Sequence, residues 1–314
     1  MYKYSGIPID CYICDSMIGK KFNGCITAMI TPFDNNLQID YNGLRSNVKF
    51  QINKGVSGLL LLGTTGESPT INDNEFERII ITTMEEAKGH VPVIVGSGTN
   101  STEKTIEKTK KVEKLGADAA LIVTPYYNKP TQEGIFRHFK SISESVNMPI
   151  IIYNIPGRTG TNITTETLIR ISKLDNIIGV KEASGNINQM IEVLQKLPED
   201  FIVLSGDDAM TLPLMSVGGN GVMSVVSNIL PEHVLKMVEL ASLGKIKEAS
   251  KIHFELMPLF KDLFIETNPI PIKTAMSLVG MPSGKFRLPL CEMEQANKEK
   301  LKKTLMLYKE LKII

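Results

Sequence analysis

Short runs of apolar and β-branched residues recur along this chain, separated by segments in which apolar residues return every three or four positions. Such runs, bounded by glycine, proline, asparagine or aspartate, are typical of buried strands, and the wider spacing is typical of amphipathic helices. The pattern predicts strands over residues 24–31, 57–62, 91–96, 119–124, 149–154, 177–181, 201–206 and 221–226.

The segments between the strands carry helix start and stop signals. Asn72 precedes an acidic first turn, Ser101 opens a second helix that Gly116 closes, and Thr131 precedes a third. About eight strands, each followed by a helix, predict an α/β fold of the (β/α)8 TIM barrel type. An open doubly wound sheet is the alternative, but the Gly-Ser-Gly turn at 96–98 lacks the third glycine of a dinucleotide-binding loop.

The strand pattern stops after residue 226, and helical spacing follows near 231–243, 245–266, 268–279 and 293–312. The first of these segments would complete the ring of barrel helices, and the rest would form a C-terminal helical appendage. We therefore expect three parts. They are a poorly ordered N-terminal extension over 1–20, a catalytic barrel over 21–244 and a helical region over 245–314.

Composition narrows the classes of function. The 314 residues are 42% hydrophobic and carry a formal net charge of +1, with no long block of like charge. This balance gives no sign of a nucleic-acid partner, and no apolar run approaches the length of a membrane span. We expect a globular protein with a sizeable core and no membrane partner.

Cysteine and histidine give no sign of a metal site. Cys11 and Cys14 have metal-ligand spacing, but no second pair completes a tetrahedral set. The histidines fall in predicted helices or turns rather than at strand ends: His90, His138, His233 and His253. The few cysteines and the absence of a secretory signal pattern predict a cytoplasmic protein without a metal.

Lys181 ends the predicted strand over 177–181, and a turn follows it. A buried ammonium is unfavourable, so a lysine at the end of an apolar strand either pairs with a counter-ion or loses its proton. A neutral lysine is a nucleophile that condenses with a keto group as a Schiff base. A lysine that extends to the solvent is the ordinary alternative, and the neighbouring strands decide between the two.

In a parallel barrel the carboxyl ends of the strands meet on one face, where the site is built. The turn 63–67 (Gly-Thr-Thr-Gly-Glu) follows one strand, and its glycines let the backbone approach a ligand closely. The hydroxyls of Thr64 and Thr65 and their amides are suited to hold a carboxylate. Alone, such a turn would be read as structural.

Three further residues follow other strands. Tyr127 has the ordinary reading of a loop-anchoring aromatic. Tyr153 offers a phenol that can exchange a proton beside an amine, and Arg158 offers a fork for a carboxylate. Each residue has a structural explanation by itself. Together with Lys181 they indicate an enzyme that performs imine chemistry on a small keto acid.

Four segments resemble the signatures of the dihydrodipicolinate synthases: 63–67 (GTTGE), 153–160 (YNIPGRTG), 178–183 (IGVKEA) and 268–273 (NPIPIK). This family consists of class I aldolase-type lyases, also called 4-hydroxy-tetrahydrodipicolinate synthases. The likeness extends from Phe22 to the C-terminus. It implies condensation of pyruvate with L-aspartate 4-semialdehyde in diaminopimelate and lysine biosynthesis. It also implies no cofactor and a homotetramer built as a dimer of dimers.

The resemblance implies a role for each matching catalytic position. Lys181 would form the Schiff base with pyruvate, and Tyr153 would be the general acid and base. Thr64 would link Tyr153 to Tyr127 in a proton relay. Tyr127 would reach across a subunit contact into the site of a neighbouring copy, so that a dimer is the smallest complete unit.

The resemblance also implies the substrate-binding positions. Thr65 and the nearby amides would hold the carboxylate of pyruvate. Arg158 would hold the carboxylate of L-aspartate 4-semialdehyde at the mouth of the site. The backbone around Gly206 and Met223 would line the lysine pocket.

This chain departs from lysine-regulated relatives at two positions, with Lys104 where they have a carboxylate and Phe76 where they have a histidine. A cation at 104 would repel the amino groups of lysine, so weak or absent feedback inhibition by lysine is expected.

Other functions share the fold and the lysine. N-acetylneuraminate lyases and 2-keto-3-deoxygluconate aldolases use the same enamine, but an arginine at 158 suits a short aldehyde that carries its own carboxylate. A barrel that binds a keto acid without catalysis is a more distant alternative, because a fold does not dictate a function.

Overall fold

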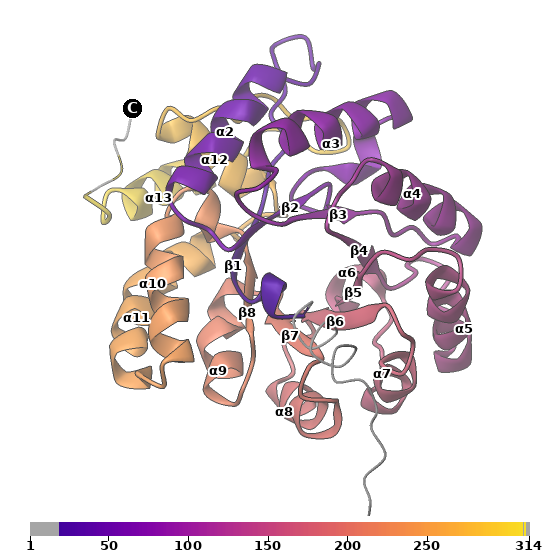
Figure 1. Cartoon of the computed structure of the whole chain (residues 1–314). Coiled ribbons are helices and arrows are strands. Elements are labelled where there is room, and N and C mark those ends of the chain that lie inside the picture. Colours follow the sequence, from indigo (N-terminus) through magenta and orange to yellow (C-terminus); the bar gives the residue numbers. More distant parts are fainter. Residues whose placement is uncertain (1–18, 310, 312–314) are drawn as a thin grey trace, which may run out of the picture.

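The computed structural model describes residues 19–309 and 311, and in it eight parallel strands close into a barrel (Figure 1). Neighbouring strands pair in parallel around the ring, and β8 pairs with β1 to close it. The predicted (β/α)8 barrel is therefore confirmed. The strands are β1 (Gly24–Ala28), β2 (Gly58–Leu61), β3 (Val93–Gly96), β4 (Ala119–Val123), β5 (Ile150–Asn154), β6 (Ile177–Glu182), β7 (Ile202–Ser205) and β8 (Gly221–Ser224).

All eight predicted strands are present; seven of them are shorter than the pattern indicated, and β6 is one residue longer. β1 ends at Ala28 instead of residue 31, and β8 ends at Ser224 instead of residue 226. At β8 the reason is a carboxylate from another part of the chain. The carboxylate of Asp208 accepts the backbone N–H groups of Val225 at 2.9 Å and Val226 at 3.2 Å, so these amides are not available to a sheet ladder.

Helices cover the outside of the barrel (Figure 1). The predicted helix starts are confirmed, because Asn72, Ser101 and Thr131 are N-caps whose side chains accept backbone N–H groups. The helices are α2 (Tyr41–Asn53), α3 (Asp73–Ala87), α4 (Thr102–Lys114), α5 (Gln132–Ser143), α7 (Thr165–Ile171), α8 (Ile187–Lys196), α9 (Thr211–Ser216) and α10 (Pro231–Ser242). Shorter helical turns are η1 (Gly19–Phe22), η2 (Ser68–Thr70), α6 (Pro156–Thr159), η3 (Asp208–Met210) and η4 (Val226–Asn228).

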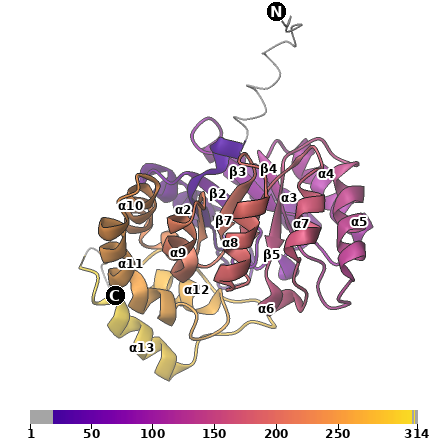
Figure 2. The same ribbon diagram turned by 90° about the horizontal axis from the view of Figure 1, so that it is seen from below.

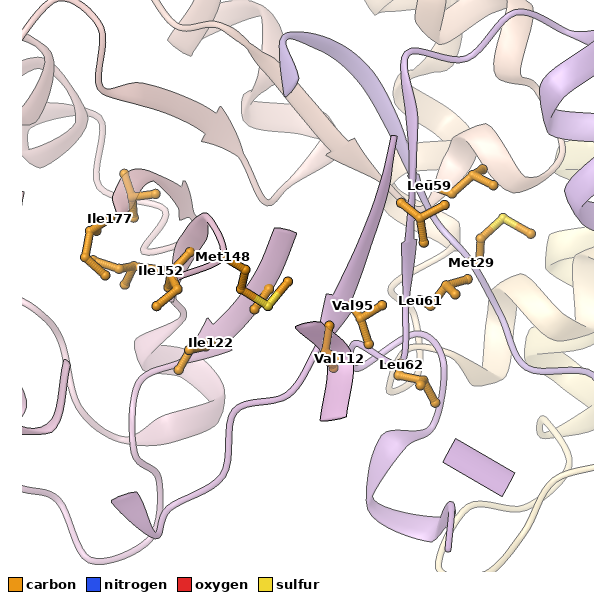
Figure 3. Packing of buried hydrophobic residues seen from close by; sticks show 14 of the residues in the cluster. Met29, Leu59, Leu61, Leu62, Val95, Val112, Ile122, Met148, Ile152 and Ile177 are labelled. Atoms are coloured by element: carbon orange, nitrogen blue, oxygen red, sulfur yellow. The ribbon is translucent and has the colours of Figure 1, made fainter. Parts of the chain in front are cut away.

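The strands are apolar on both faces because both faces are buried. Leu59 and Leu61 of β2 pack outward against the helices, in the layer that Figure 3 shows. Leu60, between them, points into the barrel interior, which the other strands fill with inward-facing residues such as Ile94, Leu121, Ile151 and Leu204. This alternation explains why the sequence shows continuous apolar runs rather than a polar and apolar repeat.

Three further helices form the C-terminal region: α11 (Ile246–Asp262), α12 (Ile270–Leu278) and α13 (Gln295–Leu305). The predicted helices are confirmed, although α11 and α13 end earlier than expected. α11 packs beside α10, and α13 packs against α11 and α12. Figure 2 shows α12 and α13 at the same end of the barrel as α6, which follows β5. The C-terminal region therefore lies at the end where the strands finish.

Most of the predicted N-terminal extension, residues 1–18, lies outside the described residues. Phe22, at the end of η1, is 1% exposed and belongs to the cluster inside the barrel. Among the described residues, no helix is both long and apolar enough to cross a membrane.

Candidate active site

A cavity of about 400 Å³ opens where the strands end. Its wall comes from the segments that follow β2, β3, β4 and β5, and from two segments of the C-terminal region, 267–269 and 289–290. Chemically important residues of the wall are Thr64, Tyr126, Tyr153, Arg158 and Asn268. A barrel of this type carries its site at this end, so the cavity is the candidate active site.

Lys181 lies against Tyr153, which forms part of the cavity wall. The two residues are direct partners across β5 and β6, so both side chains point into the barrel. The Nζ atom of Lys181 lies 4.3 Å from the centroid of the Tyr153 ring, and both residues are 6% exposed. The prediction that Lys181 is buried beside a phenol is therefore confirmed by the geometry.

Burial lowers the pKa of Lys181 from 10.5 to about 8, because an ammonium loses hydration inside the barrel. The negative charge of Asp208 opposes this shift in pKa, and the positive charge of Arg158 adds to it. At pH 7 roughly a tenth of the amine is uncharged, which is far more than for an exposed lysine. A neutral amine of this kind can attack a carbonyl carbon.

Burial raises the pKa of Tyr153 to about 12, and the charge of Asp207 also favours the neutral phenol. The charge of Arg158 and a side-chain hydrogen bond with Thr64 act in the opposite direction and lower this pKa. The phenol is therefore neutral near pH 7. It can donate its proton to one group while it accepts a proton from another.

The turn 63–67 is held in an unusual backbone conformation. Leu62, which precedes the turn, and Glu67, its last residue, have φ angles of 54° and 53°, in the left-handed region that non-glycine residues rarely adopt. A Cβ atom on Gly66 would lie 2.9 Å from the backbone nitrogen of Leu62, so only glycine fits there. Such strain clusters at functional sites when the surrounding structure fixes it.

Thr65 of this turn is 4% exposed, and its Oγ1 accepts a hydrogen bond of 2.9 Å from Nδ2 of Asn268. Arg158, on α6, is exposed at the cavity, and its Nη2 donates to the backbone oxygen of Asn268 at 3.3 Å. Arg158 lines the cavity, whereas Thr65 is not part of the cavity wall and contacts a residue that is, Asn268. One residue of the C-terminal region, Asn268, contacts both.

Gly206, one of the two residues predicted to line the lysine pocket, lies beside Lys181. Gly206 follows β7, and a Cβ atom on it would come within 3.1 Å of Cγ and Cε of Lys181. Its missing side chain therefore leaves room for the lysine. Met223 of β8 is 1% exposed and belongs to the same interior cluster as Tyr153.

Tyr127 is not brought to the cavity within one chain. It is 89% exposed, and its φ angle of 75° lies in the left-handed region. Tyr126, the residue before it, lines the cavity instead. Within one chain Tyr127 therefore contributes nothing to the cavity wall.

The two positions considered for lysine feedback differ in their surroundings. Phe76 is 3% exposed, and Nζ of Lys108 lies 5.1 Å from its ring centroid. Lys104 is exposed on α4 and is not part of the cavity wall, whereas Lys108, one helical turn later, is. Of these two lysines, Lys108 is thus the cation that faces the cavity.

Sequence reasoning assigned no role to three buried polar residues near the site. Asp208 is 2% exposed and accepts hydrogen bonds from Ser224 and two backbone amides; burial raises its pKa to about 6. Lys273 forms an ion pair of 2.6 Å with Glu67, and both side chains are fully buried. Asn268 is the third. The segment 268–273 was visible as a resemblance, but no spacing rule connects it to a turn two hundred residues earlier.

A metal site is not evident in the described part of the chain, where no three histidine, cysteine, aspartate or glutamate residues gather closely enough to hold an ion. Cys25 is buried and Cys291 is exposed, and both are free thiols. Cys11 and Cys14 lie outside the described residues.

Comparison with known proteins agrees with this geometry. The model of the dihydrodipicolinate synthetase family matches residues 21–307. The 4-hydroxy-tetrahydrodipicolinate synthase of Protochlamydia amoebophila (strain UWE25) is 52% identical over 281 residues, which cover 88% of this chain and 94% of that protein.

Two solved structures extend the comparison. Dihydrodipicolinate synthase from Aquifex aeolicus has a TM-score of 0.90 and 44% identity, and the match covers 93% of this chain and 100% of that one. A monomeric dihydrodipicolinate synthase variant also has a TM-score of 0.90 and 44% identity, over 92% and 97% of the two chains. With a family match over most of its length and relatives at this level of identity, the chain belongs to the dihydrodipicolinate synthetase family.

Proposed function

We propose that this protein is a lyase with 4-hydroxy-tetrahydrodipicolinate synthase activity, which condenses pyruvate with L-aspartate 4-semialdehyde. The relatives at about 50% identity carry this name. The observation that carries the proposal is the buried amine of Lys181, whose pKa is lowered to about 8 and which lies 4.3 Å from the ring of Tyr153. Such an amine is suited to form an imine with a keto acid.

The reaction balances without an oxidant or reductant. The amine of Lys181 attacks the keto carbon of pyruvate, and loss of water gives an imine. The imine loses a proton from the methyl group and becomes an enamine, whose carbon attacks the aldehyde and forms the new carbon–carbon bond. The amino group of the second substrate then attacks the imine carbon, which closes the ring and releases Lys181. No step requires a metal or an organic cofactor.

In this proposal Tyr153 exchanges the protons. Its phenol is neutral near pH 7 and interacts with Thr64. General acid–base help of this kind is typically worth about 10²–10⁴-fold in rate. Tyr127 of a second copy would continue the relay, and its high exposure and strained backbone support a contact outside the chain. We propose a dimer of dimers, although one structural relative is described as monomeric.

Substrate binding follows from the charges at the cavity. Thr65 and the amides of its turn would hold the carboxylate of pyruvate. Arg158 would hold the carboxylate of L-aspartate 4-semialdehyde, and Gly206 and Met223 would leave room for Lys181. In the proposed organisation, residues 21–244 form the catalytic barrel and residues 245–314 form the region that completes the cavity wall. A cytoplasmic location is part of the proposal.

Weak feedback inhibition by lysine remains a proposal. The expectation from the sequence was based on Lys104, whereas the cation at the cavity wall is Lys108. Either cation would repel a diamino acid, since like charges in a partly desolvated site are unfavourable. Titration of the activity with lysine tests this: strong inhibition at low lysine concentration would contradict it.

Borohydride reduction in the presence of pyruvate, followed by peptide mass mapping, tests the reaction class. The expected result is a reduced pyruvate adduct on Lys181. An adduct on another lysine, or no adduct, would overturn the assignment. A panel of aldehydes then identifies the second substrate. L-Aspartate 4-semialdehyde should react fastest, and preference for a polyhydroxylated aldehyde would instead indicate a sugar-acid aldolase.

A further inference from the structure

Asn268 is the residue that touches both proposed substrate-binding groups. Its side chain donates to Thr65 Oγ1 at 2.9 Å, and its backbone oxygen accepts from Arg158 Nη2 at 3.3 Å. Asn268 is 5% exposed and lines the cavity. It belongs to the C-terminal region, 203 residues away from Thr65. Both contacts therefore join the barrel to a segment that lies outside it.

We propose that Asn268 is a positioning residue, which fixes the hydroxyl of Thr65 as a hydrogen-bond donor toward the carboxylate of pyruvate. The inference rests on the proposed function, because it assumes that Thr65 binds that carboxylate. It adds a role for a residue that has no reacting atoms. Specificity for a 2-oxo acid would then depend on the C-terminal region as well as on the barrel.

The direction of each hydrogen bond depends on which of the two groups has a proton to donate. A threonine hydroxyl has one proton to give and two lone pairs to receive. The amide nitrogen of Asn268 is a donor only, so it occupies a lone pair of Thr65 and leaves the hydroxyl proton free. That proton can then be donated to an anionic oxygen, which is a strong acceptor. An acceptor at the same place would take the proton and turn lone pairs toward the substrate.

The contact with Arg158 allows an effect on pyruvate binding to be distinguished from an effect on aldehyde binding. The arginine is held by the backbone oxygen of Asn268, which a side-chain substitution leaves in place. Substitutions at 268 should therefore change the binding of pyruvate and leave the binding of the aldehyde substrate nearly unchanged. A residue with only a general structural role would affect both substrates.

Two substitutions of Asn268 distinguish the donor from mere bulk. Asn268→Ala removes the amide, and Asn268→Asp has the same shape but offers an acceptor where the donor stood. Pyruvate concentration is varied, and the half-saturating value for borohydride-trapped adduct on Lys181 is measured. We expect this value to rise about tenfold in Asn268→Ala, a typical loss for a hydrogen bond that supports a charged group. In Asn268→Asp it should rise about a hundredfold, because a carboxylate also repels pyruvate.

Asn47 provides a matched control. It is 2% exposed, and its Nδ2 donates to the backbone oxygen of Pro282 at 2.7 Å, so it also joins the barrel part of the chain to the C-terminal region. In both Asn47 and Asn268 the side-chain oxygen has no partner among the described residues. Asn47 is not part of the cavity wall. Asn47→Ala should therefore lose stability and keep the half-saturating pyruvate concentration of the unmodified protein.

A double-substitution cycle tests the path through Thr65. Thr65→Val removes the hydroxyl, and adding Asn268→Ala to it should raise the half-saturating pyruvate concentration by less than twofold further. If the alanine variant does not fold, Asn268→Leu, which keeps the bulk and removes the amide without adding a charge, replaces it in this cycle. Steady-state assays should show an aldehyde KM that changes by less than about twofold in Asn268→Ala.

The outcomes separate the two levels of the proposal. If the unmodified protein forms no pyruvate adduct on Lys181, the proposed function fails. If it forms the adduct but both Asn268 variants keep its pyruvate dependence, the positioning role fails and the proposed function stands. Equal effects of alanine and aspartate, or equal effects on both substrates, would also overturn the positioning role.

Discussion

The molecule buries two lysines near the same turn, and their surroundings differ. Lys181 is 6% exposed beside the ring of Tyr153, and no ion pair involving it is found within the described residues. Lys273 is 1% exposed and forms an ion pair of 2.6 Å with Glu67. Its Nζ also donates to the backbone oxygen of Lys285 at 2.6 Å.

The two sites also share a feature. Each ammonium lies over an aromatic face, Lys181 at 4.3 Å from Tyr153 and Lys273 at 4.4 Å from Phe33. Cation–π contact alone therefore does not distinguish them. The counter-ion does, because a carboxylate in contact stabilises the charged form of one lysine and a phenol does not. A buried lysine with a full set of partners is structural, and one without a carboxylate partner is available for chemistry.

Burial lowers the pKa of both lysines, but only one of them has a carboxylate in contact that opposes the shift. Burial lowers the pKa of Lys273 and raises that of Glu67, and the mutual attraction of the two groups opposes both shifts. For Lys181 burial prevails and lowers the pKa from 10.5 to about 8. At neutral pH this shift in pKa lowers the free energy of unfolding by about 3 kcal/mol.

The largest expected effect comes from Lys181→Met, which keeps the bulk and removes the amine. Activity should fall by a factor on the order of 10⁴ or more, since a missing nucleophile is not replaced. Stability at pH 7 should rise, by up to about 3 kcal/mol, because the desolvated ammonium is gone. Chemical denaturation and a turnover assay measure both quantities. A variant that is inactive and strongly destabilised would contradict this account of Lys181.

The sign of the pH dependence follows from the same pKa. Below pH 8 the amine of Lys181 is protonated in both states, and its full unfavourable contribution is present. Between pH 8 and about 10.5 the unfolded chain holds a proton that the folded chain has released. This contribution of Lys181 therefore makes stability rise with pH in that window, and Lys181→Met should abolish it.

Tyr153→Phe makes the surroundings of Lys181 resemble the apolar rings around Lys273. The ring and the burial remain, and the phenol oxygen is lost. We expect a loss of about 10²–10⁴-fold in turnover, the usual range for a general acid–base group. Pyruvate should still be trapped on Lys181, more slowly. Stopped-flow trapping measures this, and an unchanged turnover would exclude proton transfer by Tyr153.

Lys273→Met tests the structural lysine. It leaves the carboxylate of Glu67 buried without its partner, so stability should fall by about 3–5 kcal/mol. Adding Glu67→Gln should recover most of that loss, because a neutral amide is less costly to bury. Folded Lys273→Met should still form the pyruvate adduct on Lys181 at saturating pyruvate. If a denaturant titration showed no loss of stability in Lys273→Met, the ion pair would not stabilise the turn 63–67.

Asp208→Asn should give the smallest effect. The charge of Asp208 raises the pKa of Lys181, so the neutral amide should lower that pKa further, by about one unit or less. The pH profile of adduct formation would shift toward acid, with up to about tenfold faster trapping below pH 7. Asn can still accept the two backbone amides and donate to Ser224. A profile that stays in place would show that Asp208 does not act on Lys181.

Much of the fold and of the candidate site could be predicted from the pattern of apolar and polar residues along the chain. The eight strands were located because buried parallel strands leave continuous apolar runs. Lys181 and Tyr153 could be expected together because both follow from strand order and register, and neighbouring parallel strands end on one face. The turn at 63–67 was recognised by its glycines, and the structure shows that close backbone contact requires one of them, Gly66.

Other parts of the site could not be located from local patterns. Asn268 and Thr65 are 203 residues apart, and Lys273 and Glu67 are 206 apart. The partner of a buried polar group depends on how the C-terminal helices dock, and no periodicity or spacing records that. The early end of β8 could not be predicted for the same reason, because it depends on a carboxylate from another element.

Local sequence determined which residues are strands, which are helices and which chemistry stands at each strand end, because propensity and burial pattern act over a few residues. Tertiary structure decided the state of each buried lysine. The pKa of an amine depends on the charges and water within a few ångströms, and those come from segments that meet only when the barrel closes and the C-terminal helices cover its end.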